Sequence, residues 1–279
     1  MNKKKRTYSF TTILKMTAGL IAGYSFWFFL LLLALRWVNP PFTSFTLQED
    51  WDDQGKDRYS LREYWVEKNE LPEHLKWAVI AAEDQRFWEH NGIDLIAISK
   101  ALEEREEEGR IRGASTISQQ VSKNLFLWGE PSYVRKGLEA VITLGIESLW
   151  PKDRILEMYL NIAEFGPGVY GAGKAVDEYF GKPVKELSAE EAARMAAVLP
   201  NPKVMRINPP SPYVAKRKNW ILRNMTQLSG ISYYSQPKEK EQESASSDFP
   251  HSDSITKTKP DLSNIWLADS EADSTQMEN

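Results

Sequence analysis

The sequence has 279 residues, of which 42% are apolar, so it is long enough for one substantial domain with a core of its own. Its 35 basic residues are balanced by 39 acidic ones, and no basic patch interleaved with aromatic residues stands out, so we expect no nucleic-acid partner. Cysteine is absent, which excludes disulfides, thiolate metal sites and a cysteine nucleophile.

The first predicted element is a transmembrane anchor over residues 16–38. Residues 16–35 carry no charge, and twenty apolar residues in a helix are enough to cross a hydrocarbon core. Basic residues precede this run and acidic residues dominate after it, so the positive-inside rule predicts that residues 1–15 form a cytoplasmic tail. A cleaved signal peptide is the alternative, but the run is long for a signal core and no small-x-small cleavage site follows it.

The remaining chain divides by composition. We interpret residues 39–58 as a linker, residues 59–230 as one mainly α-helical domain, and residues 231–279 as a disordered polar tail rich in Ser, Asp, Glu, Lys and Gln. Helical periodicity dominates the domain, as at Ile155, Met158, Tyr159 and Ile162. In the tail, the Ile265–Leu267 cluster is either a weak docking peptide or without a role.

Glu83 is the first candidate for chemistry. At helical spacing it lies between Val79 and Phe87, at the edge of an apolar stripe. Partial burial raises the pKa of a carboxyl group toward the range where it can act as a base near neutral pH. Taken alone, a glutamate at the border of an amphipathic helix is more often an ordinary solvated or ion-paired residue.

A helix is predicted to begin after Thr116, which forms a capping-box pattern with Gln119. On this helix Gln120, Lys123 and Asn124 share one face. A helix start rich in hydroxyls and backbone donors, with a lysine further along, suits a phosphate or a sugar. A capped surface helix is the alternative.

Two cations and a carboxylate follow on the next predicted helix. Arg135 and Lys136 lie four and three residues before Glu139. This spacing predicts either an ordinary exposed ion pair or a carboxylate that holds two cations in place for an anionic ligand.

The segment from Gly166 to Gly171 is predicted to form a tight turn, because it contains three glycines and a proline. A nucleotide P-loop is excluded, since no Gly-Lys-Ser or Gly-Lys-Thr follows. Ser188 and Glu191 form a second capping-box pattern, which predicts a helix that ends near residues 199–202.

In their order and spacing these segments resemble the peptidoglycan glycosyltransferases, the transglycosylase modules of bifunctional penicillin-binding proteins and their stand-alone relatives. The resemblance runs from about residue 61 to residue 228. No Ser-x-x-Lys stands in a suitable setting and the chain leaves no room for a transpeptidase domain, so we expect the monofunctional biosynthetic form. Ala114 stands where many relatives have a second glycine, and this small change is not expected to abolish function. The motifs that carry the resemblance are Glu83–Gly92, Gly113–Gln120, Lys123–Leu127, Arg135–Glu139, Ile155–Asn161, Tyr170–Gly171 and Glu190–Ala193.

The resemblance implies a mainly α, lysozyme-like domain in which two lobes flank a cleft. It implies polymerisation of glycan chains from lipid II and lipid-linked glycan, with inversion to a β-1,4 linkage and release of undecaprenyl diphosphate. It places the enzyme in the inner membrane as a single-pass protein with its catalytic domain in the periplasm, and it makes cell-wall synthesis or division proteins candidate partners. Mg²⁺ or Mn²⁺ often assists in this family, although the sequence contains no strong ligand cluster and requires no cofactor.

Residue roles follow from the same resemblance. Glu83 matches the catalytic base that takes the proton of the acceptor 4-hydroxyl, and Glu139 matches a second carboxylate on the pyrophosphate side. The remaining matches are three cations near the donor pyrophosphate and three polar residues lining the cleft: Lys123, Arg135 and Lys136, and Ser115, Gln120 and Asn161.

Residues 99–112 are highly charged and correspond to the mobile membrane-proximal region of relatives, so we expect poor order there. Two other function classes remain open at this point. A lytic muramidase would share the fold and the glutamate, but the group of cations favours a pyrophosphate donor. A catalytically silent scaffold of the cell-wall machinery is the third option.

Overall fold

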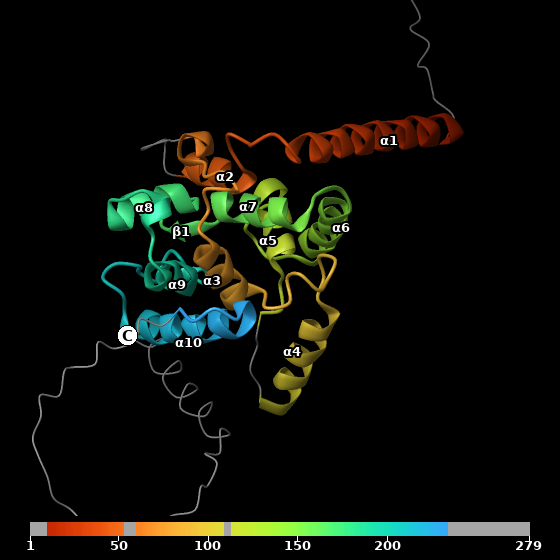
Figure 1. Ribbon diagram of the computed structural model, residues 1–279. Coiled ribbons are helices and arrows are strands. Elements are labelled where there is room, and N and C mark those ends of the chain that lie inside the picture. The colour runs from red at the N-terminus through yellow and green to blue at the C-terminus, as the bar shows by residue number, and fades with distance from the viewer. Residues whose placement is uncertain (1–9, 53–59, 109–112, 234–279) are drawn as a thin grey trace, which may run out of the picture. The chain divides into compact units, whose positions relative to one another are not determined.

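The computed structural model describes residues 10–52, 60–108 and 113–233, and all statements of structure below concern these residues (Figure 1). Within them the fold is mainly α, as predicted. The α-helices are α1 (Phe10–Leu35), α2 (Ser44–Asp52), α3 (Glu73–Glu83), α4 (Leu95–Glu108), α5 (Ile117–Phe126), α6 (Tyr133–Leu149), α7 (Lys152–Ile162), α8 (Ala172–Phe180), α9 (Ala189–Val198) and α10 (Pro212–Ser229).

The shorter elements complete the domain. They are two turns of 3₁₀ helix, η1 (Leu61–Tyr64) and η2 (Val184–Glu186), and an antiparallel hairpin of β1 (Glu164–Gly166) and β2 (Val169–Tyr170). The hairpin occupies the predicted glycine-rich turn, and Gly168 and Gly171 adopt positive φ angles of 72° and 87°. Such angles favour glycine because a Cβ would clash with the backbone.

Two groups of helices form the core. In one group α3, α9 and α10 pack against one another, and in the other α5 packs against both α6 and α7. The apolar repeat predicted on α7 is buried throughout, with Ile155, Met158, Tyr159 and Ile162 each at most 1% exposed. Glu83 lies at the end of α3, and the other predicted site residues lie just before or on α5, on α6 and on α7, so the two groups position the site between them. The predicted division into two lobes stays a prediction.

Side-chain caps set the starts of α5 and α9, as the sequence predicts. Thr116 and Gln119 form a complete capping box at α5, and Ser188 and Glu191 form another at α9. These reciprocal bonds satisfy backbone donors that have no partner inside the helix. The start of α5 is therefore a fixed point for the side chains that follow it.

Helix α1 is long and apolar enough to cross a membrane, by its length and composition. It begins at Phe10, before the first residue of the anchor predicted over residues 16–38, and it ends at Leu35, before the last residue of that anchor. Only its last turns pack on the domain, where Leu32 and Leu35 are buried. The upstream part of α1 is largely exposed, as expected for a surface that faces lipid.

The carboxyl end of α1 is held by side chains of the helical domain. Arg154 on α7 donates to the carbonyl oxygens of Leu35 at 3.1 Å and of Val38 at 3.1 Å. The indole Nε1 of Trp150 donates to the carbonyl of Leu32 at 2.7 Å. These carbonyls lack partners inside a helix end, so the domain itself caps the anchor. The joint between the end of α1 and the domain is therefore made by specific hydrogen bonds.

Two segments expected from the sequence contain helices. The linker of residues 39–58 contains α2, whose Phe45 packs against the core, and residues 53–59 lie outside the described part. Residues 99–108 belong to helix α4, whose start is capped by Asp94, and the poor order expected for residues 99–112 stays a prediction. Residues 109–112 and most of the tail predicted over residues 231–279 lie outside the described residues, as does the Ile265–Leu267 cluster.

Candidate active site

Glu83 is the last residue of α3, and the chain turns away at Asp84. The expectation that the helix continues through Phe87 is therefore wrong, because Asp84 leaves the helical conformation with φ −159° and ψ 73°. Phe87 is nevertheless fully buried next to the site. The Glu83 side chain is 14% exposed, so its carboxylate is near the surface but mostly shielded from water.

Two hydrogen bonds in series, made by neutral side chains, hold the Glu83 carboxylate. Gln120 on α5 donates from Nε2 to Glu83 Oε2 at 3.0 Å, and Tyr159 on α7 donates its hydroxyl to Gln120 Oε1 at 3.1 Å. Burial keeps the pKa of Tyr159 well above its ordinary value, so the hydroxyl remains a donor. The amide of Gln120 is thus fixed with its NH₂ group toward the carboxylate.

Burial raises the pKa of Glu83, and three neighbours oppose this shift. The hydrogen bond from Gln120 and the charges of Arg217 and Lys123 lower the pKa, whereas Asp84 raises it. The Arg217 Nη2 atom lies 3.8 Å from Glu83 Oε1, which is a loose ion pair. A carboxylate with a raised pKa and no tight cation is suited to accept a proton.

Asp84 connects the catalytic helix to the start of α5. Its Oδ2 accepts from the backbone N–H of Ile117 at 3.0 Å, and its Oδ1 accepts from His90 Nε2 at 2.9 Å. His90 Nδ1 accepts from the N–H of Gly92 at 3.1 Å, so the imidazole proton lies on Nε2. Thr116, the cap of α5, donates to the Gly92 carbonyl. The network joins Glu83 to Gln120 through backbone as well as side chains.

Glu139 on α6 is the second predicted carboxylate, and it is 2% exposed. Arg135 Nη1 lies 3.3 Å from its Oε2, and Lys136 Nζ bonds to its Oε1. Lys136 also donates to Ser115 Oγ at 3.1 Å. The structure therefore favours the predicted carboxylate that holds two cations over an exposed ion pair.

Lys123 on α5 links the two carboxylate sites electrostatically. Burial lowers the pKa of its ammonium, Arg135 and Lys136 act in the same direction, and Glu139 and Glu83 act in the opposite one. A group that senses both carboxylates and both other cations lies within range of all four. The site thus combines the shielded carboxylate of Glu83 with the carboxylate of Glu139 and its two cations, and Lys123 lies within electrostatic range of both.

Arg135 also holds an unused donor. Its Nε is buried and has no hydrogen-bond partner among the described residues. A buried donor without a partner costs about 1–3 kcal/mol unless a ligand or water satisfies it. Its position in the cation group makes an anionic oxygen the natural partner.

Asn161 is a correction to the predicted site. Its side chain is 2% exposed and does not line a cleft. Its Oδ1 accepts from the N–H of Val66 at 2.8 Å, and its Nδ2 donates to the Val66 carbonyl at 2.9 Å and to the Glu157 carbonyl at 2.9 Å. Asn161 therefore fastens the segment before α3 onto α7.

The described residues show no preformed cage for a metal ion. Both oxygens of Glu139 already bind cationic side chains, and among the described residues no three His, Cys, Asp or Glu side chains come together as ligands. Mg²⁺ is commonly held by one or two carboxylates together with substrate phosphates and water, so assistance by Mg²⁺ or Mn²⁺ stays an expectation from the family resemblance.

Three residues of the site were missed from the sequence. Asp84 stands beside Glu83, but its role depends on the distant N–H of Ile117, and Tyr159 was assigned to the apolar stripe of α7. Arg217 lies 134 positions after Glu83 on α10, and no local pattern marks it. A buried tyrosine needs a partner for its hydroxyl, and this was the one available signal.

The comparisons with known proteins agree with this geometry. The model of the transglycosylase family matches residues 53–226. Biosynthetic peptidoglycan transglycosylases are similar: that of Aeromonas hydrophila is 51% identical over 198 residues, which cover 71% of this chain and 84% of the relative. That of Ectopseudomonas mendocina is 50% identical over 210 residues, or 75% and 87%, and that of Escherichia coli is 55% identical over 183 residues, or 65% and 76%. The chain therefore belongs to the transglycosylase family, and the glycosyltransferase activity expected from its motifs is confirmed at the level of that family.

Proposed function

We propose that this protein polymerises the glycan strands of peptidoglycan from lipid II and releases undecaprenyl diphosphate. One observation supports this most strongly: a shielded carboxylate with a raised pKa, Glu83, shares Lys123 with a second group in which Arg135 and Lys136 surround Glu139. A base and a group of cations are what transfer from a sugar diphosphate requires.

In the proposed reaction Glu83 removes the proton from the 4-hydroxyl of the acceptor sugar. The 4-oxygen then forms a bond to the anomeric carbon of the donor, while the bond from that carbon to the pyrophosphate oxygen breaks. Attack from the face opposite the leaving group converts the α-linked donor into a β-1,4 linkage. General-base assistance of this kind contributes roughly 10²–10⁴-fold.

The leaving group carries away the electron pair and with it negative charge. Lys123, Arg135 and Lys136 are the cations that would receive it, and the unpartnered Nε of Arg135 offers one more donor. Positive groups placed in advance where charge develops stabilise the transition state. Glu139 orients two of these cations, and Ser115 provides the second contact of Lys136. We assign no step to Mg²⁺ or Mn²⁺.

The anchor fits a substrate that is itself held in a membrane. We infer that α1 crosses the inner membrane with its amino terminus in the cytoplasm and the catalytic domain in the periplasm. Exposed apolar side chains on α4 and α6 support contact with the bilayer, because exposed apolar surface marks interaction sites. These residues are Leu95, Ile96 and Leu102 on α4 and Tyr133, Val134, Val141 and Leu144 on α6.

The test is the product formed from labelled lipid II by the full chain in detergent. Polymer that grows with time and that a muramidase degrades is the expected result. Shortening of preformed glycan without polymer formation would instead assign a lytic reaction. No reaction in either assay, across detergents and with or without added divalent metal, would support a scaffold and overturn the proposal.

A further inference from the structure

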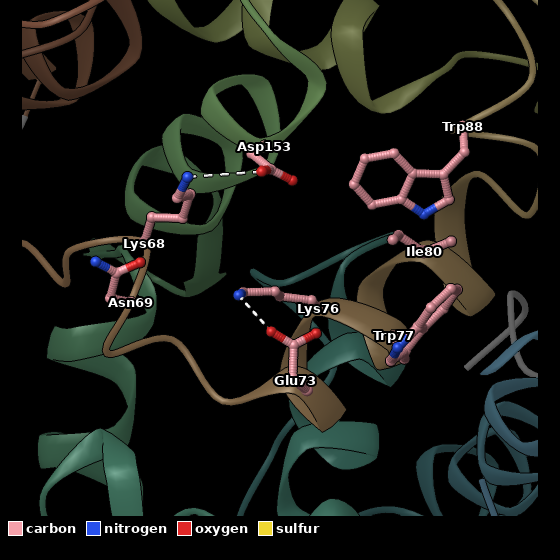
Figure 2. A pocket seen from close by; sticks show the side chains of 8 residues that line it. All are labelled: Lys68, Asn69, Glu73, Lys76, Trp77, Ile80, Trp88 and Asp153. Carbon is pink, nitrogen blue, oxygen red and sulfur yellow. Dashed lines mark hydrogen bonds and ion pairs between the residues drawn. The ribbon is translucent and has the colours of Figure 1, made fainter.

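A pocket lies apart from the catalytic group, and none of the residues that line it belongs to that group. Its volume is about 360 Å³, within the roughly 300–1,000 Å³ of small-molecule sites. It opens between the segment before α3, the outer side of α3, the start of α7 and the loop after α3 (Figure 2). The lining residues are Lys68, Asn69, Glu73, Lys76, Trp77, Ile80, Trp88 and Asp153.

An indole ring forms one wall of this pocket. Trp88 is 47% exposed, and Figure 2 shows its ring above Ile80 with the open space beside it. Phe87, which is fully buried, meets Trp88 edge-on with ring centroids 5.0 Å apart. The buried ring anchors the exposed one, so a flat apolar face is held ready at little entropic cost.

The polar side chains of the pocket cancel one another in charge. Lys76 Nζ lies 2.8 Å from Glu73 Oε1, and Lys68 Nζ lies 3.6 Å from Asp153 Oδ2, as the dashed lines in Figure 2 show. Two cations and two anions leave no net charge, in contrast to the cation group around Glu139. Such a lining gives no preference to a phosphate or a lipid anion. It offers many donors and acceptors to a neutral ligand.

We propose that this pocket is a second carbohydrate site that takes a neutral N-acetylated sugar unit of a glycan strand. A pyranose ring presents a flat face of C–H groups, which packs on an exposed indole, and an edge of hydroxyls, which suits Asn69 and the carboxylate of Asp153. The proposal rests on the proposed function for the source of the ligand, since the polymerised strand would supply such units. The site would hold that strand beside the enzyme without contacting the reacting atoms.

The experiment is ¹⁹F NMR of the full chain in detergent, labelled with fluorotryptophan and titrated with the neutral tetramer of N-acetylglucosamine. Comparison with Trp88→Phe assigns one of the ten tryptophan signals to Trp88. We expect a saturable shift of that signal, and affinity about tenfold weaker in Asn69→Ala. Trp88→Ala should weaken binding similarly when it is measured by calorimetry. Trp128→Phe, which alters another exposed tryptophan outside the pocket, is the matched control and should bind normally.

Any of the following results would overturn the site. The Trp88 signal does not move, or it moves equally in Asn69→Ala, or it responds to a sugar-free stem peptide and not to the tetramer. Lys136→Ala, which alters only the catalytic group, must leave the titration unchanged, and a lost shift there would place the sugar in the active site instead. Lipid II polymerisation by the same preparation separates the two claims. Polymerisation without a Trp88 shift refutes this pocket alone, and a Trp88 shift without polymerisation refutes the proposed function alone.

Discussion

The carboxylate of Asp84 accepts a hydrogen bond from the backbone N–H of Ile117 at 3.0 Å. This bond ties the residue after the proposed base to the first residue of α5, the helix that carries Gln120. The base and its hydrogen-bond donor therefore come from elements far apart in the sequence that are joined at a single buried carboxylate. The position of Gln120 relative to Glu83 depends on this joint as much as on their own contact.

The first prediction concerns Asp84→Ala. The change leaves the N–H of Ile117 and the Nε2–H of His90 without their charged acceptor, so we expect a loss of about 2–3 kcal/mol in the free energy of unfolding. Urea unfolding in detergent measures it. The molecules that remain folded should also polymerise lipid II more slowly, because α5 no longer holds Gln120 in place. Asp153→Ala, which removes an exposed carboxylate near the start of α7, is the control and should unfold like the wild type.

The second prediction concerns the pH dependence of catalysis. Because burial raises the pKa of Glu83, the rate should fall on the acid side at a pH above the ordinary range of a glutamate, as the base becomes protonated. The hydrogen bond from Gln120 lowers this pKa, so Gln120→Ala should move the acid limb of kcat/KM to still higher pH. Profiles of kcat/KM for lipid II between pH 4 and 9 measure the shift.

Gln85→Ala is the control for this profile, since its amide is exposed and bonds to Asn224 instead. It should keep the wild-type limb. An acid limb that moves to lower pH in Gln120→Ala, or that does not move, would contradict the assigned hydrogen bond.

The third prediction separates a structural asparagine from a substrate contact. Asn161→Ala removes the partners of both the N–H and the carbonyl of Val66, so the unfolding free energy should fall by about 2–3 kcal/mol. The KM for lipid II in the folded protein should stay unchanged. A large rise in KM with normal stability would show instead that Asn161 contacts substrate, as the family motif suggested.

The fourth prediction tests the joint between the anchor and the domain. Arg154→Ala leaves the carbonyls at the end of α1 without their cap and the buried Glu157, 3.0 Å from Arg154, without its cation. Removing one partner of a buried ion pair costs about 3–5 kcal/mol. Arg154→Lys should be intermediate, because lysine keeps the charge but not the fork of donors.

Hydrogen exchange at residues 36–38 measures the effect on the joint, and it should quicken most in Arg154→Ala. Arg223→Ala, an exposed arginine on α10, should leave exchange there unaltered. Equal exchange in wild type and Arg154→Ala would mean that the anchor is a loose tether.

Sequence reasoning predicted the parts of the site that depend on local spacing. Arg135, Lys136 and Glu139 occupy one helix at intervals of three and four, and the capping boxes of α5 and α9 are contained within four residues each, so each pattern carries its own geometry. Glu83 was found because a carboxylate is unusual beside an apolar stripe. The mainly α fold followed from the same periodicity.

The remainder depends on contacts between distant segments. Arg217 meets Glu83 only because α10 packs on α3, and Asn161 is structural only because Val66 lies against it. The end of α3 at Glu83 was missed because the apolar spacing continues to Phe87, which is buried by a turn and not by a helix. Helix α2 was missed because nine residues with few apolar positions give no period.

The fifth prediction concerns the stability of Glu83→Gln, the same variant that tests the catalytic role of Glu83. A carboxylate whose pKa is raised in the fold destabilises it once the pH exceeds the pKa of the unfolded chain, and the effect is complete above the folded pKa. Glutamine removes this penalty and keeps an acceptor for Gln120. At pH 7 the variant should therefore melt at or above the wild-type temperature, and the advantage should shrink as the pH falls and vanish below the pKa of the unfolded chain, where Glu83 is protonated in both states.

The most direct test is single-turnover transfer with lipid II by wild type and Glu83→Gln at pH 7, with both proteins shown to be folded. A loss of at least about 10²-fold in the rate of the chemical step is predicted, because the 4-hydroxyl loses its base. A Glu83→Gln variant that forms polymer at the wild-type rate would contradict the assignment of Glu83 and with it the reaction proposed for this site.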